Sequence, residues 1–141
     1  MNRLLLICCF LVGSLTACAS GSHSYPWKIE ESTLQSTENI AVQFSITNGT
    51  VSNAGAEIRI VNNSENRITF GYEYRIQILV DNKWYDICVT QDFPAEMIYL
   101  DPGAVRTEKI EWENSYGKLP TGTYRIWRDC SAGQMSCVFI I

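Results

Sequence analysis

The sequence predicts an all-β domain, a single antiparallel β-sandwich of about seven strands. Three observations lead to this prediction. Apolar and polar residues alternate over short stretches, and residues that favour turns (Asn, Gly, Asp and Pro) separate those stretches. Beyond the first seventeen residues, no stretch sustains the three-and-four apolar spacing of a helix over two turns. We therefore expect almost no helix in the folded domain.

The strands are expected to follow one another from residue 40 to the end of the chain. In the first of them, Ile40, Val42, Phe44 and Ile46 share one face. The same period-two reading gives strands at 40–47, 56–60, 72–80, 84–89, 104–112, 122–130 and 136–141. Turn signals separate them at residues 62–64, 81–82, 101–103 and 120–122. Trp112 continues the inward phase of Ile110 and is expected in the core.

One tyrosine near the end of the chain sharpens the topology. The stretch Leu119-Pro120-Thr121-Gly122-Thr123-Tyr124 leads into the sixth predicted strand. In Greek-key sandwiches a tyrosine at such a corner buries its ring, and its hydroxyl bonds to the backbone a few residues upstream. We favour this role for Tyr124 over that of an ordinary strand tyrosine.

Several motifs give the chain a family resemblance. They are Ile60-Val61-Asn62-Asn63-Ser64, Ile68-Thr69-Phe70-Gly71, Asp81-Asn82-Lys83-Trp84-Tyr85, Leu100-Asp101-Pro102-Gly103 and the stretch from Tyr116 to Ile126. With these motifs, residues 54–141 resemble the immunoglobulin-like domains of small secreted or lipid-anchored bacterial proteins. The resemblance implies an Ig-like fold, no enzymatic activity and no cofactor. It transfers no functional residue, and Cys88, Cys130 and Cys137 are not part of the pattern.

The N-terminus has the form of an export signal. Arg3 precedes an uncharged apolar run from Leu4 to Val12, and Leu15-Thr16-Ala17-Cys18 follows. This ending resembles a bacterial lipobox, whose cysteine is lipidated and becomes the new N-terminus. We expect a signal peptide at 1–17, the lipidated Cys18 and a flexible tether at 18–39, and the β-sandwich at 40–141. Ordinary secretion and an uncleaved anchor remain as alternatives.

Lipidation of Cys18 would place the protein outside the cytoplasm, on the cell membrane or the outer membrane. Removing residues 1–17 takes away Arg3 and no acidic residue, so the formal net charge changes from −4 to about −5. Nucleic-acid binding needs a basic surface, which this acidic chain lacks. We expect no nucleic acid among its partners.

Three cysteines remain after the signal and the lipid site, namely Cys88, Cys130 and Cys137. Disulfides can form in an exported protein, so one pair and one free thiol are expected. The last two strands are predicted to form a hairpin with a six-residue loop at 131–136, which sets Cys130 opposite Cys137. This predicts a cross-strand disulfide between them. A bridge from Cys88 to either of the other two is the alternative.

The sequence offers little for catalysis or metal binding. The only histidine, His23, lies in the predicted tether, where nothing would hold an imidazole for a nucleophile. Zinc sites use several Cys and His ligands, so we expect no metal. Glu108, Glu111 and Glu113 surround one strand, and a carboxylate pair could serve a glycan hydrolase. A solvated strand face explains the same residues.

Aromatic residues indicate a possible binding surface. Trp127 is out of phase with Tyr124 and Ile126, so it is expected to point outward. With Arg125, Trp84 and Tyr85 it would form a contact surface for a protein or a glycan. The leading hypothesis is a non-catalytic module that binds a protein of the bacterial envelope. A structural lipoprotein that offers a strand edge to a partner is the second hypothesis, and the hydrolase is the third.

Overall fold

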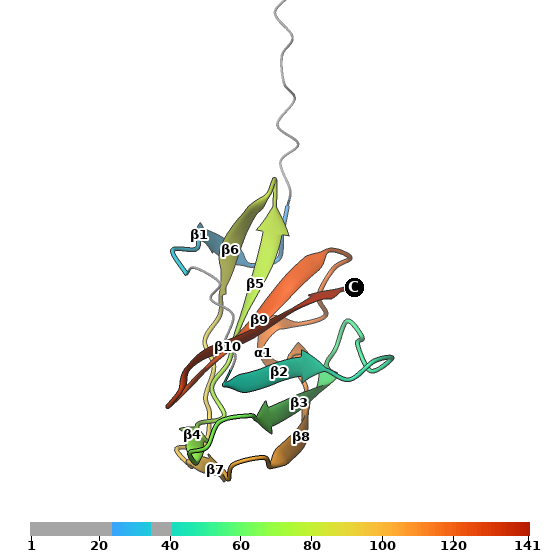
Figure 1. Cartoon of the computed structure of the whole chain (residues 1–141). Coiled ribbons are helices and arrows are strands. Elements are labelled where there is room, and N and C mark those ends of the chain that lie inside the picture. The colour runs from blue at the N-terminus through green and yellow to red at the C-terminus, as the bar shows by residue number, and fades with distance from the viewer. Residues whose placement is uncertain (1–23, 35–40) are drawn as a thin grey trace, which may run out of the picture.

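The computed structural model describes residues 24–34 and 41–141, and their regular secondary structure is almost entirely β-strand (Figure 1). The elements are β1 (Lys28–Glu31), β2 (Val42–Ile46), β3 (Ala56–Asn62), β4 (Ile68–Phe70), β5 (Arg75–Val80), β6 (Lys83–Cys88), β7 (Ile98–Leu100), β8 (Val105–Ile110), α1 (Glu113–Tyr116), β9 (Thr123–Cys130) and β10 (Gly133–Ile140).

The strands form two antiparallel sheets. The smaller sheet has the order β2-β3-β8. The larger has the order β1-β6-β5-β9-β4-β7, and β10 pairs with β9 beside this path. Every strand pair is antiparallel. The predicted all-β sandwich is therefore confirmed, and its seven expected strands correspond to β2, β3, β5, β6, β8, β9 and β10.

Side chains from both sheets meet in one core. Ile58 and Ile60 of β3 and Ile76 and Ile126 of the larger sheet are completely buried. Alternation explains this, because residues two apart on a strand point to the same face. Trp112 is also completely buried and stacks on Phe139, with ring centroids 5.0 Å apart. Its predicted core position is confirmed.

The predicted tyrosine corner is present. Tyr124 is buried, and its hydroxyl donates a hydrogen bond to the carbonyl oxygen of Pro120 at 2.7 Å. The hydroxyl reaches back four residues, as the sequence predicted. The corner fixes the entry of the chain into β9, the strand that pairs with both β5 and β10.

Part of the predicted tether belongs to the folded domain, and this corrects the expected boundary at residue 40. Strand β1 pairs with β6, with Lys28 opposite Cys88 and Glu31 opposite Tyr85 (Figure 1). The indole N–H of Trp27 also donates to the carbonyl oxygen of Tyr116. The open edge of β6 captures a short strand whose own sequence shows no long alternation. Cys18 and residues 35–40 lie outside the described residues.

Short elements account for the remaining differences. Strands β4 and β7 have three residues each, too few for the period-two pattern to stand out. The four-residue helix α1 is a single turn that follows β8. No helix in the described residues is long and apolar enough to cross a membrane.

Candidate functional site

The structure buries most of the predicted aromatic surface. Trp127 does point to the face opposite Tyr124 and Ile126, but only 1% of it is exposed, and Arg125 is 4% exposed. Both side chains lie on the predicted outer face, but the expectation that they are available for contact is wrong. Trp84 and Tyr85 are half-buried.

The reason is a hydrogen-bonded cluster centred on Gln77. Its side-chain oxygen accepts from Arg125 Nε at 2.8 Å and from the indole N–H of Trp127. Its side-chain nitrogen donates to Asp86 Oδ1 and to Ser32 Oγ, each at 2.7 Å. Gln77 itself is completely buried, so these bonds replace those that water would make.

Two indole rings flank the buried guanidinium. The centre of the Arg125 guanidinium lies 4.3 Å from the Trp84 ring and 4.6 Å from the Trp127 ring. Burial lowers the pKa of Arg125, and the nearby Asp86 carboxylate opposes that effect. Tyr85 points to the other face of β6 and packs against the core. The structure therefore brings three of the four residues together as an internal cluster that holds Ser32, next to β1, against the sheet.

The predicted disulfide is not formed, and the hairpin register explains why. Cys130 pairs with Gly133 across a two-residue turn, and Cys137 pairs with Ile126. Cys137 is thus four residues along β10 from the position opposite Cys130, or about 13 Å. A disulfide needs Cα atoms about 4.4–6.8 Å apart. In this register Met135 is buried opposite Arg128, and β10 begins at Gly133.

All three cysteines in the described part of the chain are free thiols. Cys88 is exposed, while Cys130 and Cys137 point toward the core. Burial raises the pKa of Cys130, and it raises the pKa of Cys137 to about 12. The alternative bridge from Cys88 is also not formed, since Cys88 lies on the opposite face of the sheet.

The predicted carboxylate pair does not have the arrangement that glycoside hydrolysis needs. Both oxygens of Glu108 accept from arginines, one from Arg128 and the other from Arg106 at 2.9 Å. Glu111 pairs with Lys109 at 2.6 Å, and the hydrogen bond from this lysine lowers the pKa of Glu111. A general acid needs a raised pKa. Glu111 is therefore not held as such an acid, and both Glu108 oxygens are engaged by arginines.

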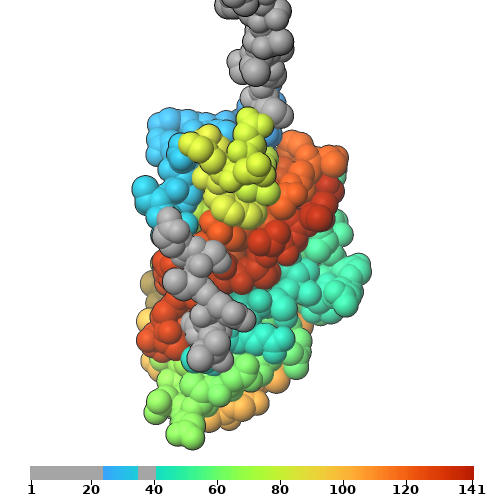
Figure 2. All heavy atoms as spheres, turned by 45° about the horizontal axis from the view of Figure 1, so that its top comes forward, coloured from blue at the N-terminus to red at the C-terminus, as the bar shows by residue number. Residues whose placement is uncertain are grey.

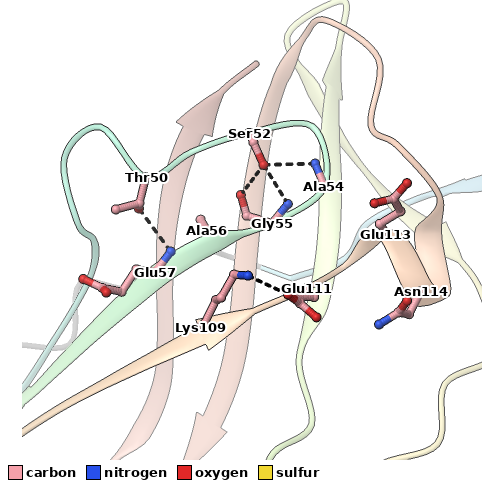
Figure 3. A pocket seen from close by; sticks show the side chains of 10 residues that line it. All are labelled: Thr50, Ser52, Ala54, Gly55, Ala56, Glu57, Lys109, Glu111, Glu113 and Asn114. Carbon is pink, nitrogen blue, oxygen red and sulfur yellow. Dashed lines mark hydrogen bonds and ion pairs between the residues drawn. The ribbon is translucent and has the colours of Figure 1, made fainter.

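A polar hollow of about 380 Å³ lies over the outer face of β3 and β8 (Figure 3). Glu57, Lys109, Glu111 and Glu113 surround it. In the described residues, no group of three or more His, Cys, Asp and Glu side chains is placed to hold a metal ion. The hollow therefore offers a solvated, mainly acidic surface.

Hydroxyl groups fix the loop that forms one wall of this hollow. Ser52 Oγ accepts from the N–H groups of Ala54 and Gly55, and Thr50 Oγ1 accepts from the N–H of Glu57 (Figure 3). A Cβ at Gly55 would lie 2.3 Å from the carbonyl oxygen of Ile110, so only glycine permits this close approach to β8. The small residues Ala54, Gly55 and Ala56 also line the hollow.

A second surface feature, which the sequence did not identify as a site, lies along the last strand. In the described part of the chain, β10 pairs as a strand with β9 alone. A hollow of about 350 Å³ lies between residues 137–140 of β10 and residues 45–51, at the end of β2 and in the loop after it. Figure 2 shows the red atoms of β10 next to the teal atoms of this segment. Val138 and Ile140 are 57% and 71% exposed.

We call this feature, residues 137–140 with the adjoining hollow, the β10 edge. Its two exposed side chains share one face of the strand, so they form an apolar pair at the surface. The alternation in 136–141 predicted the strand, but nothing in it showed that β9 would be its only strand partner among the residues that the structure describes. Pairing partners are set by distant segments.

Comparison with known proteins agrees with this architecture. The sequence profile of the family described as bacterial Ig-like domain matches residues 38–137. No curated protein matches the chain. The profile covers well over half of the sequence, and the two antiparallel sheets and the tyrosine corner are those expected of such a domain. The chain therefore belongs to the bacterial Ig-like domain family.

Proposed function

We propose that this chain is a lipid-anchored module of the bacterial envelope that binds a partner protein through the β10 edge. Its family makes it a bacterial module of the extracellular type. The lipobox-like ending at Cys18 supports the anchor. The proposed role is non-catalytic. The β10 edge takes the place of the aromatic binding surface expected from the sequence, because the central residues of that surface are buried.

The observation that carries the proposal is the edge of β10 away from β9, which pairs with no other strand of the described residues and lies next to a hollow. An edge strand presents backbone N–H and C=O groups that can pair with an extended segment of another protein. The hollow between residues 137–140 and 45–51 gives a place for alternate side chains of that segment. The exposed apolar pair, Val138 and Ile140, adds contact area. Natural edges are commonly blocked by charges or proline, and neither occurs at residues 137–140.

The binding experiment uses the full chain in bacterial cells, with a photo-crosslinking residue at position 138 or, as a matched control, at position 105. Val105 is 49% exposed and lies on β8, an edge strand of the other sheet. We expect one discrete adduct from position 138 and none from 105. The purified complex should also protect the backbone amides of 137–140 from hydrogen exchange. Equal labelling from both positions, or no added protection, would contradict the strand-edge role.

The anchor is tested separately. Growth with labelled palmitate should label the wild-type chain and leave Cys18→Ser unlabelled and outside the membrane fraction. An unlabelled wild-type chain that still carries residues 1–17 by mass would overturn the lipid anchor. That result would leave the β10 edge as a binding surface to be judged by crosslinking.

A further inference from the structure

Two neighbouring hollows lie beside the loop between β6 and β7. Their volumes are about 530 and 310 Å³. Tyr74, Asp92, Phe93 and Arg128 line both of them. We call the two hollows together the Phe93 cleft, since this half-buried ring belongs to the wall of each.

The cleft exists because the larger sheet is interrupted at this point. Phe70 of β4 pairs with Cys130, and Arg75 of β5 pairs with Trp127. Between these two pairs the chain advances five residues on the side of β4 and β5, from 70 to 75, but only three residues on β9, from 127 to 130. Residues 71–74, between β4 and β5, leave the ladder here, so Arg128 and Asp129 have no strand partner on this side, as at a β-bulge. Residues at such interruptions are often directed at a ligand.

Buried hydrogen-bond donors at the cleft lack partners. Arg128 is 3% exposed, and its two terminal nitrogens bond to Glu108 and to the carbonyl oxygen of Tyr72. Its third nitrogen, Nε, is buried and has no hydrogen-bond partner among the described residues. Nε2 of Gln91, in the wall of the larger hollow, also makes no hydrogen bond of good geometry, although the Gln91 side chain interacts with the Tyr74 hydroxyl and opposes the rise of the Tyr74 pKa that burial causes. Native proteins rarely leave such groups unpaired, so a buried donor in the wall of the cleft favours a ligand that brings an oxygen acceptor.

The charges around the cleft limit what that acceptor can be. Glu73, Asp92 and Asp129 are exposed at the larger hollow, against Arg75 and Arg128. The Arg128 charge is already balanced by Glu108. An anionic ligand in the larger hollow would therefore meet an excess of negative charge. A neutral ligand fits better when its oxygens accept from buried donors and its hydroxyls donate to carboxylates.

Two aromatic rings in the wall of the cleft add an apolar surface. Tyr74 and Phe93 meet edge to face, with ring centroids 5.3 Å apart. Sugars carry both features that the cleft can match, because their hydroxyls donate and accept while their C–H faces pack on aromatic rings. The size also fits, since small-molecule sites usually enclose about 300–1,000 Å³.

We propose that the Phe93 cleft is a binding site for a neutral oligosaccharide. The buried donors of Arg128 and Gln91 bind its oxygens, the carboxylates of Asp92 and Glu73 accept from its hydroxyls, and Phe93 packs against a sugar face. This site is distinct from the β10 edge and does not depend on the lipid anchor.

The test titrates the isotope-labelled full chain, in a phosphocholine detergent without sugar headgroups, with maltotriose, tri-N-acetylchitotriose and acetate. We expect at least one of the two saccharides to shift the resonances of Gln91, Phe93 and the Trp127 indole, and acetate to leave them in place. Phe93→Ala should weaken that binding about tenfold, the scale of a lost ring contact. Asp92→Asn should weaken it as well, while Glu96→Gln in the same loop should not.

Three results would overturn the site. The first is that neither saccharide shifts these resonances at tens of millimolar. The second is that acetate alone shifts them, which would mean that the cleft binds carboxylates. In the third case a saccharide binds with equal strength to Phe93→Ala. Each variant is first checked for the wild-type amide spectrum outside the loop at 89–97, so that loss of binding reports the cleft and not unfolding. Substitution at Val138 should leave the titration unchanged.

Discussion

The Tyr124 hydroxyl donates to the carbonyl oxygen of Pro120 at 2.7 Å, and this bond ties the start of β9 to the preceding loop. The Tyr124 ring also stacks on Phe139 of β10, with centroids 5.6 Å apart. The ring and the hydroxyl thus hold the same corner by packing and by hydrogen bonding. The two contributions can be separated by substitution.

Tyr124→Phe keeps the ring and removes the hydroxyl. We expect it to lower the free energy of unfolding by about 1 kcal/mol, the usual net value of one hydrogen bond. Urea denaturation followed by tryptophan fluorescence measures the change. Tyr99→Phe is the matched control, since Tyr99 is 63% exposed and should change stability by less than about 0.5 kcal/mol. Equal stability of the two variants would show that the corner bond contributes nothing.

The ion pair between Arg128 and Glu108 bridges the two sheets. The two side chains are only 2% and 12% exposed. Glu108→Gln leaves the arginine charge buried without its partner, and breaking such a pair costs about 3–5 kcal/mol. Arg128→Met combined with Glu108→Leu removes both charges and should recover most of that loss, because apolar replacements are often neutral.

Thermal and urea unfolding of the single and double variants test this coupling. Glu111→Gln is the control on the same segment, because the Glu111 side chain is 57% exposed in its pair with Lys109. Exposed pairs contribute about 0–1 kcal/mol. If the double variant proved less stable than Glu108→Gln, packing in the cleft would outweigh the charge effect.

Local pattern was enough to predict the sandwich, the corner and the core position of Trp112. Each depends on periodicity or on residues close in sequence. The period-two pattern also gave Trp127 its correct face. The predicted exposure of Trp127 was wrong, because the residues that cover it are distant in sequence. Gln77 lies fifty residues away, and β1 brings Ser32 over the same face. No local pattern reveals a cover supplied by a distant strand.

The predicted pairing of Cys130 with Cys137 was wrong for a related reason. Met135 and Cys137 share the inward phase, but a short hairpin admits several loop lengths with the same inward set. The turn residue Ser131 and Thr69 of β4 settle the choice. The Ser131 N–H donates to the Thr69 carbonyl oxygen, and the Thr69 N–H donates to Ser131 Oγ, both at 2.9 Å. Strand β4 was not predicted, so this constraint was absent from the sequence argument.

The thiols should differ sharply in reactivity. Alkylation of the native protein near pH 8 should label Cys88, which is exposed. Cys137 should stay unlabelled, because burial raises its pKa to about 12 and thiolate is the reactive form. Peptide mass mapping measures both, and unfolding in urea should make Cys137 reactive. Rapid labelling of Cys137 in the folded protein, or a Cys130–Cys137 disulfide under non-reducing conditions, would contradict the register.

Buried tyrosines should make the fold sensitive to alkali. Burial raises the pKa of Tyr74 and that of Tyr124 to about 12 each, and it raises the pKa of Tyr116 as well. An unfolded tyrosine ionises near pH 10, so above that pH the folded state holds protons that the unfolded state has lost. The contribution of these groups to stability is complete below about pH 10 and is lost as pH rises toward 12.

Urea midpoints measured from pH 8 to pH 12 test this dependence. We expect the midpoint to fall with increasing steepness above about pH 10, and to fall less steeply in Tyr124→Phe, which has one such proton fewer. The comparison uses the slope and not the absolute midpoint, because the variant already starts lower from the loss of its hydrogen bond. A wild-type midpoint that stays constant to pH 12, or identical slopes for the two proteins, would mean that the Tyr124 phenol ionises alike in the folded and unfolded states.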